Sequence, residues 1–105
     1  MQEMNVKELA ERIKAGRAPI IIDVREPEEY QHARIEGALL KPLGGITQWA
    51  QELDKDQEYV LQCHTGSRSW QAAYLLEQLG FKKLYNLSGG IDSWSTHVDP
   101  NVPRY

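Results

Sequence analysis

Strand-like and helix-like patterns alternate along the whole chain, and this alternation constrains its fold more than any other feature. Continuous apolar or β-branched runs indicate four strands, at Pro19–Val24, Ala38–Pro42, Tyr59–Cys63 and Lys83–Leu87. Segments with apolar residues at helical spacing lie between and around them. Such an order is typical of an α/β fold with a largely parallel sheet. The length of 105 residues predicts a single domain, residues 1–105.

Five segments are expected to be helical. They are Val6–Lys14 with Asn5 as N-cap, a short helix opened by Pro27 through Tyr30, a helix from Ile46 to about Asp54, a helix that begins about Ser69 and stops at Gly80, and a last helix from Ile91 to about His97. The residues Asp99–Tyr105 contain two prolines and are expected to be an extended tail.

Composition and charge exclude several classes of function. A net charge of -3 leaves no electrostatic footprint for nucleic acid. The amino terminus lacks the apolar core of a signal peptide, and no run is long enough to span a bilayer, so we expect a cytoplasmic protein without a membrane partner. Gly44-Gly45 and Gly89-Gly90 match no nucleotide motif, so we expect no cofactor.

The chain has one cysteine, Cys63, which excludes an internal disulfide and a two-cysteine redox mechanism. The three histidines are dispersed, so no metal site is expected. Cys63 ends a predicted strand and precedes the loop His64-Thr65-Gly66-Ser67-Arg68, at the sheet edge where α/β proteins bind ligands. Backbone amides of a tight loop, the following helix and the cation of Arg68 would together favour a thiolate.

Other interpretations of Cys63 are open at this point. A lone cysteine that ends a strand is often an inert, buried, small hydrophobic residue. The polar, glycine-bearing loop after it favours a reactive cysteine instead. A Cys–His hydrolase would use His64 as its base, but adjacent residues on a tight loop seldom face each other. We therefore expect His64 to be a half-exposed side chain at the mouth of the site.

The segment Cys63-His64-Thr65-Gly66-Ser67-Arg68-Ser69 resembles the Cys-x-x-Gly-x-Arg-Ser loop of the rhodanese-like domains. The resemblance continues upstream through Asp23-Val-Arg25, Glu29-Tyr30 and Gly37-Ala38, and downstream through Leu87-Ser-Gly-Gly-Ile91 and Trp94. It implies an α/β rhodanese-like fold: a central, mostly parallel, five-stranded sheet flanked by helices on both faces. It also implies Cys63 as the catalytic residue, with a substrate-binding loop made of His64, Thr65, Gly66, Ser67 and Arg68.

The resemblance implies a sulfurtransferase that carries sulfane sulfur as a persulfide on Cys63. The donor would be thiosulfate or a persulfide, and the acceptor cyanide in the test tube or a biological nucleophile. The closing segment looks like the ending of rhodanese domains fused to molybdopterin or thiamine sulfurylases, so a protein sulfur acceptor or carrier is a further expectation. Four residues separate Cys63 from Arg68, whereas related phosphatases and arsenate reductases have five. A non-catalytic, partner-binding module is the main alternative.

Two departures from the family pattern affect these expectations. Ala33-Arg34-Ile35 replaces the usual Gly-His-Ile, which puts the local helix ending in doubt. His64 stands where a basic residue is common and would be only partly charged at neutral pH. Asp23 and Arg25 either support the active loop or form an ordinary ion pair. The three tryptophans, Trp49, Trp70 and Trp94, are expected in the core, with Trp70 the exception to watch.

Overall fold

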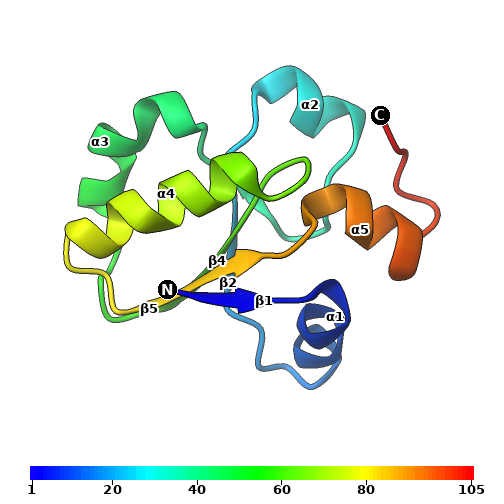
Figure 1. Cartoon of the computed structure of the whole chain (residues 1–105), viewed down its shortest axis with the longest axis horizontal. Coiled ribbons are helices and arrows are strands. Elements are labelled where there is room, and N and C mark those ends of the chain that lie inside the picture. The colour runs from blue at the N-terminus through cyan, green and yellow to red at the C-terminus, as the bar shows by residue number, and fades with distance from the viewer.

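A computed structural model describes all residues from Met1 to Tyr105. Its centre is a five-stranded sheet, in which every paired strand is parallel to its neighbour. The strands are β1 (Gln2–Met4), β2 (Ile20–Asp23), β3 (Leu39–Leu40), β4 (Glu58–Gln62) and β5 (Lys83–Leu87), in the spatial order β1-β5-β4-β2-β3 (Figure 1). The prediction of a parallel, five-stranded α/β fold is confirmed.

The helices are α1 (Val6–Lys14), α2 (Pro27–His32), α3 (Ile46–Trp49), α4 (Ser67–Gln78) and α5 (Gly90–His97), with 3-10 turns at Leu43–Gly45 and Ala50–Glu52. Asn5 caps α1 as expected, because its side chain accepts a hydrogen bond from the Glu8 amide. No helix combines the length and the apolar character that crossing a bilayer would demand.

Two apolar layers form the core, one on each face of the sheet. Successive residues of a strand point to opposite faces, so Leu61 joins the layer under α3 and α4 while Val60 joins the layer under α1 and α5. Both side chains are fully buried. This two-sided burial explains why the central strands are continuous apolar runs, and it confirms the prediction of helices on both faces.

The order of the strands identifies one edge of the sheet as the place for a ligand. The chain leaves β2 toward β3 on one side, and it leaves β4 toward β5 on the other, although β2 and β4 are neighbours. Connections that diverge in this way open a crevice at the carboxyl ends of the two strands. Cys63 directly follows β4 and the segment from Asp23 to Arg25 ends β2, so both lie at this point.

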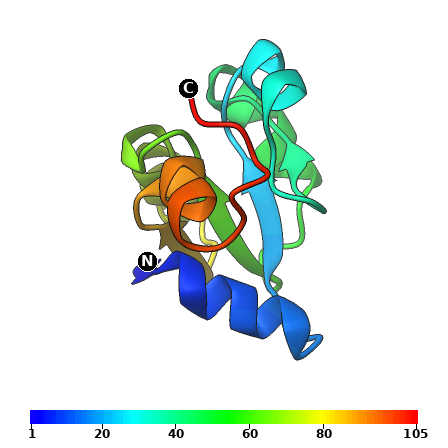
Figure 2. The same cartoon turned by 90° about the vertical axis from the view of Figure 1, so that its right-hand side faces the viewer.

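Several boundaries differ from the sequence-based expectation. β1 was not predicted, because it has three residues and only Met4 is buried. The helix expected over Ile46–Asp54 is a short α-helix followed by a 3-10 turn, which ends at Glu52. α4 begins at Ser67, two residues before the expected start, because Gly66 takes a left-handed conformation that lets the helix begin at once. The closing segment Asp99–Tyr105 runs back toward α2 (Figure 2).

Candidate active site around Cys63

The sulfur of Cys63 lies beneath the loop that joins β4 to α4, and the residue is only 1% exposed. The Gly66 amide donates a hydrogen bond to Sγ over 3.1 Å, and the Ser69 hydroxyl oxygen lies 3.3 Å from Sγ. Gly66 has φ +115°, a conformation that favours glycine. The loop therefore brings one backbone donor and one hydroxyl to the sulfur.

The start of α5 fixes two peptide groups of the loop. The Ile91 amide donates to the Cys63 carbonyl over 2.9 Å, and the Asp92 amide donates to the His64 carbonyl over 3.0 Å. In a trans peptide the N–H points away from the C=O, so the amides of His64 and Thr65 point away from α5. Gly90 permits this contact, because a Cβ there would lie 2.5 Å from both carbonyl oxygens.

Arg68 forms a bidentate ion pair with Glu29 of α2, at 2.7 and 2.9 Å. The hydrogen bond from Arg68 is the main reason why the pKa of Glu29 falls to about 2. The same bond raises the pKa of Arg68, and the nearby charge of Cys63 contributes in the same direction. The cation expected beside the thiolate is thus present, but its charge is largely matched by Glu29.

A buried ion pair at the end of β2 indirectly supports the pair between Arg68 and Glu29. Arg25 and Asp23 are fully buried and lie 2.7 Å apart, and Arg25 also donates to the Ala33 carbonyl. The Tyr105 hydroxyl accepts a hydrogen bond from Arg25 over 2.8 Å and donates one to Glu29 over 2.7 Å. Asp23 and Arg25 therefore form a structural ion pair, and through Tyr105 they also help to hold Glu29 beside Arg68.

The departure at Ala33-Arg34-Ile35 leaves the local structure intact. α2 ends at His32, Ala33 adopts an extended conformation, and the carbonyl of Ala33 takes up a hydrogen bond from Arg25. The guanidinium of Arg34 lies 4.8 Å from the centre of the Tyr30 ring. The doubt about this helix ending is thereby resolved.

The remaining loop side chains contribute little to the sulfur's surroundings. His64 is half-buried as expected and stacks on the Tyr105 ring, with 4.1 Å between centroids. Its Nε2 is buried without a hydrogen-bond partner. Thr65 and Ser67 are exposed and form no side-chain hydrogen bond. Trp49 and Trp94 are buried as expected, whereas Trp70, the expected exception, is 48% exposed and stacks on Tyr74.

Sequence reasoning missed a chain of polar side chains that leads from the sulfur to β1. Ser69 is fully buried and donates to the Asn86 side-chain oxygen over 2.5 Å. The Asn86 amide nitrogen donates to both carboxylate oxygens of Glu3 and to the Gly66 carbonyl, each over 3.2 Å. These residues are far apart in the sequence, and no local pattern marks Glu3 or Asn86 as partners of Cys63.

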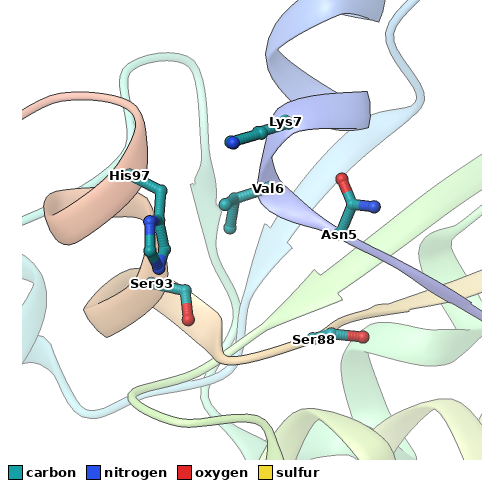
Figure 3. Close-up of a pocket in the computed structure, with 6 residues that line it drawn as sticks. All are labelled: Asn5, Val6, Lys7, Ser88, Ser93 and His97. Atoms are coloured by element: carbon teal, nitrogen blue, oxygen red, sulfur yellow. The ribbon is translucent and has the colours of Figure 1, made fainter.

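The cavity drawn in Figure 3 lies between the start of α1 and the helix α5. Its volume is about 260 Å³, and its lining includes Lys7, Ser88, Ser93 and His97. None of the four cavities in the structure is lined by Cys63. We place the candidate chemistry at Cys63 because that is where a nucleophile, a backbone donor and an arginine meet. No group of three or more His, Cys, Asp or Glu side chains is arranged to hold a metal.

The fold and the site together define a class of parallel α/β proteins that carry a lone cysteine in a glycine-bearing loop. In this class the loop follows a strand whose connection diverges from that of its neighbour. Comparison with protein families places the chain within that class. Residues 5–97 match the family described as Rhodanese-like domain. The chain therefore belongs to the rhodanese-like domain family, as its sequence motifs suggested.

The chain matches different shares of the lengths of its curated relatives. A protein named Sulfurtransferase from Allochromatium vinosum is 33% identical over 102 residues, which is 97% of this chain and 95% of that protein. The Putative sulfur carrier protein YrkF of Bacillus subtilis is 36% identical over 93 residues, and the chain spans 50% of it. The Rhodanese-like/PpiC domain-containing protein 12 of Arabidopsis thaliana is 39% identical over 89 residues, and the chain spans 30% of it.

Solved structures show the same fold. A crystal structure of a rhodanese-like domain protein from Staphylococcus aureus superimposes with a TM-score of 0.86 at 27% identity, covering 100% of this chain and 99% of that one. A Staphylococcus saprophyticus protein gives a TM-score of 0.85 at 31% identity, covering 93% of this chain and 97% of that one. The order and direction of the strands are thus those of a rhodanese-like fold.

Proposed function

We propose that this protein is a rhodanese-type sulfurtransferase in which Cys63 carries sulfane sulfur as a persulfide. The observation that carries the proposal is the position of Sγ under the loop, with the Gly66 amide donating to it over 3.1 Å. The curated relatives named as a sulfurtransferase and as a putative sulfur carrier support sulfur as the transferred group.

The first half-reaction forms the persulfide. The Cys63 thiolate attacks the outer sulfur of thiosulfate, a new S–S bond forms, and the bond to the sulfonate sulfur breaks so that sulfite leaves with the electron pair. With a persulfide donor, a thiolate leaves instead. The amides of Thr65, Ser67 and Arg68 have no acceptor within the protein, so they are free to meet negative charge on the donor or on the outer sulfur.

The second half-reaction returns the cysteine. A nucleophile attacks the outer sulfur, the S–S bond breaks, and the Cys63 thiolate leaves; cyanide would become thiocyanate. The chain has no second cysteine, so the acceptor comes from outside it. We propose a protein acceptor or carrier for the biological reaction, since the similar MoeZ of Mycobacterium tuberculosis is named a probable adenylyltransferase/sulfurtransferase.

A binding module without catalysis is the second candidate, and two observations favour it. Cys63 is 1% exposed, and Arg68 already has a carboxylate partner in Glu29. A donor would then have to displace part of the loop before the sulfur could react.

Steady-state formation of thiocyanate from thiosulfate and cyanide separates the two candidates. The sulfurtransferase proposal predicts turnover by the wild type and none by Cys63→Ala or Cys63→Ser, with circular dichroism showing that both variants fold. Cys63→Ser is the matched control, because it keeps the size of the side chain while it removes the sulfur. Absence of turnover by the folded wild type with thiosulfate and with persulfide donors would favour the binding module.

A further inference from the structure

The hydroxyl of Ser69 lies between two possible acceptors of its single proton. Its oxygen is 3.3 Å from Cys63 Sγ and 2.5 Å from the Asn86 side-chain oxygen. Ser69 and Cys63 are 0% and 1% exposed, so this contact is closed to bulk solvent. A hydroxyl carries one proton, so it can donate to the sulfur or to Asn86, but not to both.

The orientation of the Asn86 amide decides which acceptor receives that proton. One side of the amide faces the Glu3 carboxylate and the Gly66 carbonyl, each 3.2 Å away. A carboxylate and a carbonyl accept hydrogen bonds and do not donate them, so the nitrogen faces them and the oxygen faces Ser69. The Asn86 oxygen then requires the proton of Ser69, because a buried carbonyl oxygen without a donor is costly.

We infer that Asn86, held by Glu3, directs the Ser69 proton away from the Cys63 sulfur and thereby restrains formation of the thiolate. The Ser69 oxygen therefore turns a lone pair toward Cys63. This lone pair accepts a hydrogen bond from a thiol, but it does not stabilise a thiolate. When the Cys63 proton leaves to water, the Ser69 hydroxyl must turn to the sulfur and give up Asn86, or leave the thiolate with the Gly66 amide alone.

This inference rests on the proposed function, since it explains how the proposed nucleophile is kept from reacting before a donor arrives. Asn86 and Glu3 are positioning residues, because they act on the sulfur through Ser69 and do not touch it. Restraint of this kind suits a carrier with one cysteine, for which irreversible oxidation of an unprotected thiolate would end its function.

Other charged and titratable groups surround the loop and must be kept constant in a test. They are the Arg68–Glu29 pair, the Asp23–Arg25 pair, His64, Tyr105 and, on α5, Asp92. None of them is changed in the variants below. A shift in the behaviour of Cys63 that depends on the presence of the Ser69 hydroxyl cannot therefore come from their charges.

The test is a double-mutant cycle read as the pH dependence of Cys63 alkylation by iodoacetamide, followed by intact mass. The midpoint of the profile reports ionisation, whereas a change in access to the buried sulfur would scale the rate at every pH. Asn86→Leu keeps the approximate shape of the side chain and removes the acceptor. With Ser69 present, it should move the midpoint to lower pH by about 0.7 unit, which corresponds to one net hydrogen bond.

The matched control is the same substitution in a Ser69→Ala background, where no proton can be redirected and the midpoint should stay in place. An equal shift in both backgrounds, or no shift in either, would overturn the inference. If Asn86→Leu does not fold, the exposed Glu3→Ala takes its place. Its shift should be larger with Ser69 present than in the Ser69→Ala background, since the through-space effect of losing the carboxylate is the same in both and cancels in the difference.

The alkylation profile needs no sulfur donor, so it separates this inference from the proposed function. If the wild type takes up no sulfane sulfur but the cycle behaves as expected, only the sulfurtransferase proposal fails. If the wild type turns over and the Ser69-dependent shift is absent, only the inference about Asn86 and Glu3 fails.

Discussion

Replacement of Gly90 by alanine should loosen the candidate active-site loop, and the cost can be worked out from the structure. Gly90 has φ +58°, a conformation that costs an alanine about 1 kcal/mol. The new Cβ would also lie 2.5 Å from the carbonyl oxygens of Cys63 and His64. Relief of that clash separates α5 from the loop and breaks two hydrogen bonds, each worth about 1 kcal/mol. We therefore expect a total loss of roughly 3 kcal/mol.

Gly16 offers a matched control for the strain alone. It has φ +72°, but a Cβ there would meet nothing within 4 Å. Gly16→Ala should thus cost only about 1 kcal/mol. In urea unfolding followed by circular dichroism, a slope of about 1 kcal/mol/M turns these costs into midpoint shifts of about 3 M for Gly90→Ala and about 1 M for Gly16→Ala.

The alkylation rate of Cys63 provides the second readout. Gly90→Ala should speed alkylation under native conditions, because the loop opens more often when its anchors to α5 are lost. Gly16→Ala should leave the rate unchanged. Equal losses of stability in the two variants, with equal alkylation rates, would refute the argument that α5 holds the loop through the backbone contacts at Gly90.

Two ion pairs yield further predictions. The pKa of Glu29 lies at about 2, below the 4.5 of an unperturbed glutamate, so its ion pair with Arg68 stabilises the fold fully above about pH 4.5 and is lost as the pH falls through about 2. The shift in pKa limits the contribution of this ion pair to the free energy of unfolding to about 3 kcal/mol, and solvent screening at the partly exposed Arg68 reduces it to roughly 1–2 kcal/mol. Urea unfolding of Glu29→Gln should show this loss of stability at pH 7 and none near pH 2. Asp23→Asn leaves the buried Arg25 uncompensated and should cost about 3–5 kcal/mol in the same assay, whereas a loss below about 1 kcal/mol would contradict the burial of that pair.

Local patterns were sufficient to predict the framework of the fold. The apolar run Tyr59–Leu61 lies in β4, the central strand, because burial on both faces favours consecutive apolar residues. The glycine-bearing loop predicted after this strand is present, and Gly66 takes a positive φ at the start of α4. β1 escaped prediction because three residues with one buried side chain carry no detectable period.

Side-chain positions that depend on tertiary packing were harder to predict. Trp70 was the exception among the three tryptophans expected in the core, and α4 turns it outward, where it stacks on Tyr74. Ser69, which the sequence placed only at the start of a helix and in the family motif, is buried against the sulfur.

Long-range contacts of the candidate site had no local signal. Asn86 lies 17 positions beyond Ser69, and it bonds to Glu3 across 83 positions. Tyr105 reaches Arg25 from 80 positions away. The family motif pointed to Cys63 and the loop residues, but these partners follow only from the parallel pairing of β1 with β5 and from the return of the closing segment to α2.

The most direct test of the central claim is intact-mass spectrometry of the protein after treatment with thiosulfate. We expect the wild type to gain the mass of one sulfur atom, to lose it on addition of cyanide, and to show the modification on the peptide that contains Cys63; Cys63→Ala should gain nothing. A wild type that stays unmodified with thiosulfate and with persulfide donors, or a gain of sulfur that persists in Cys63→Ala, would contradict the account.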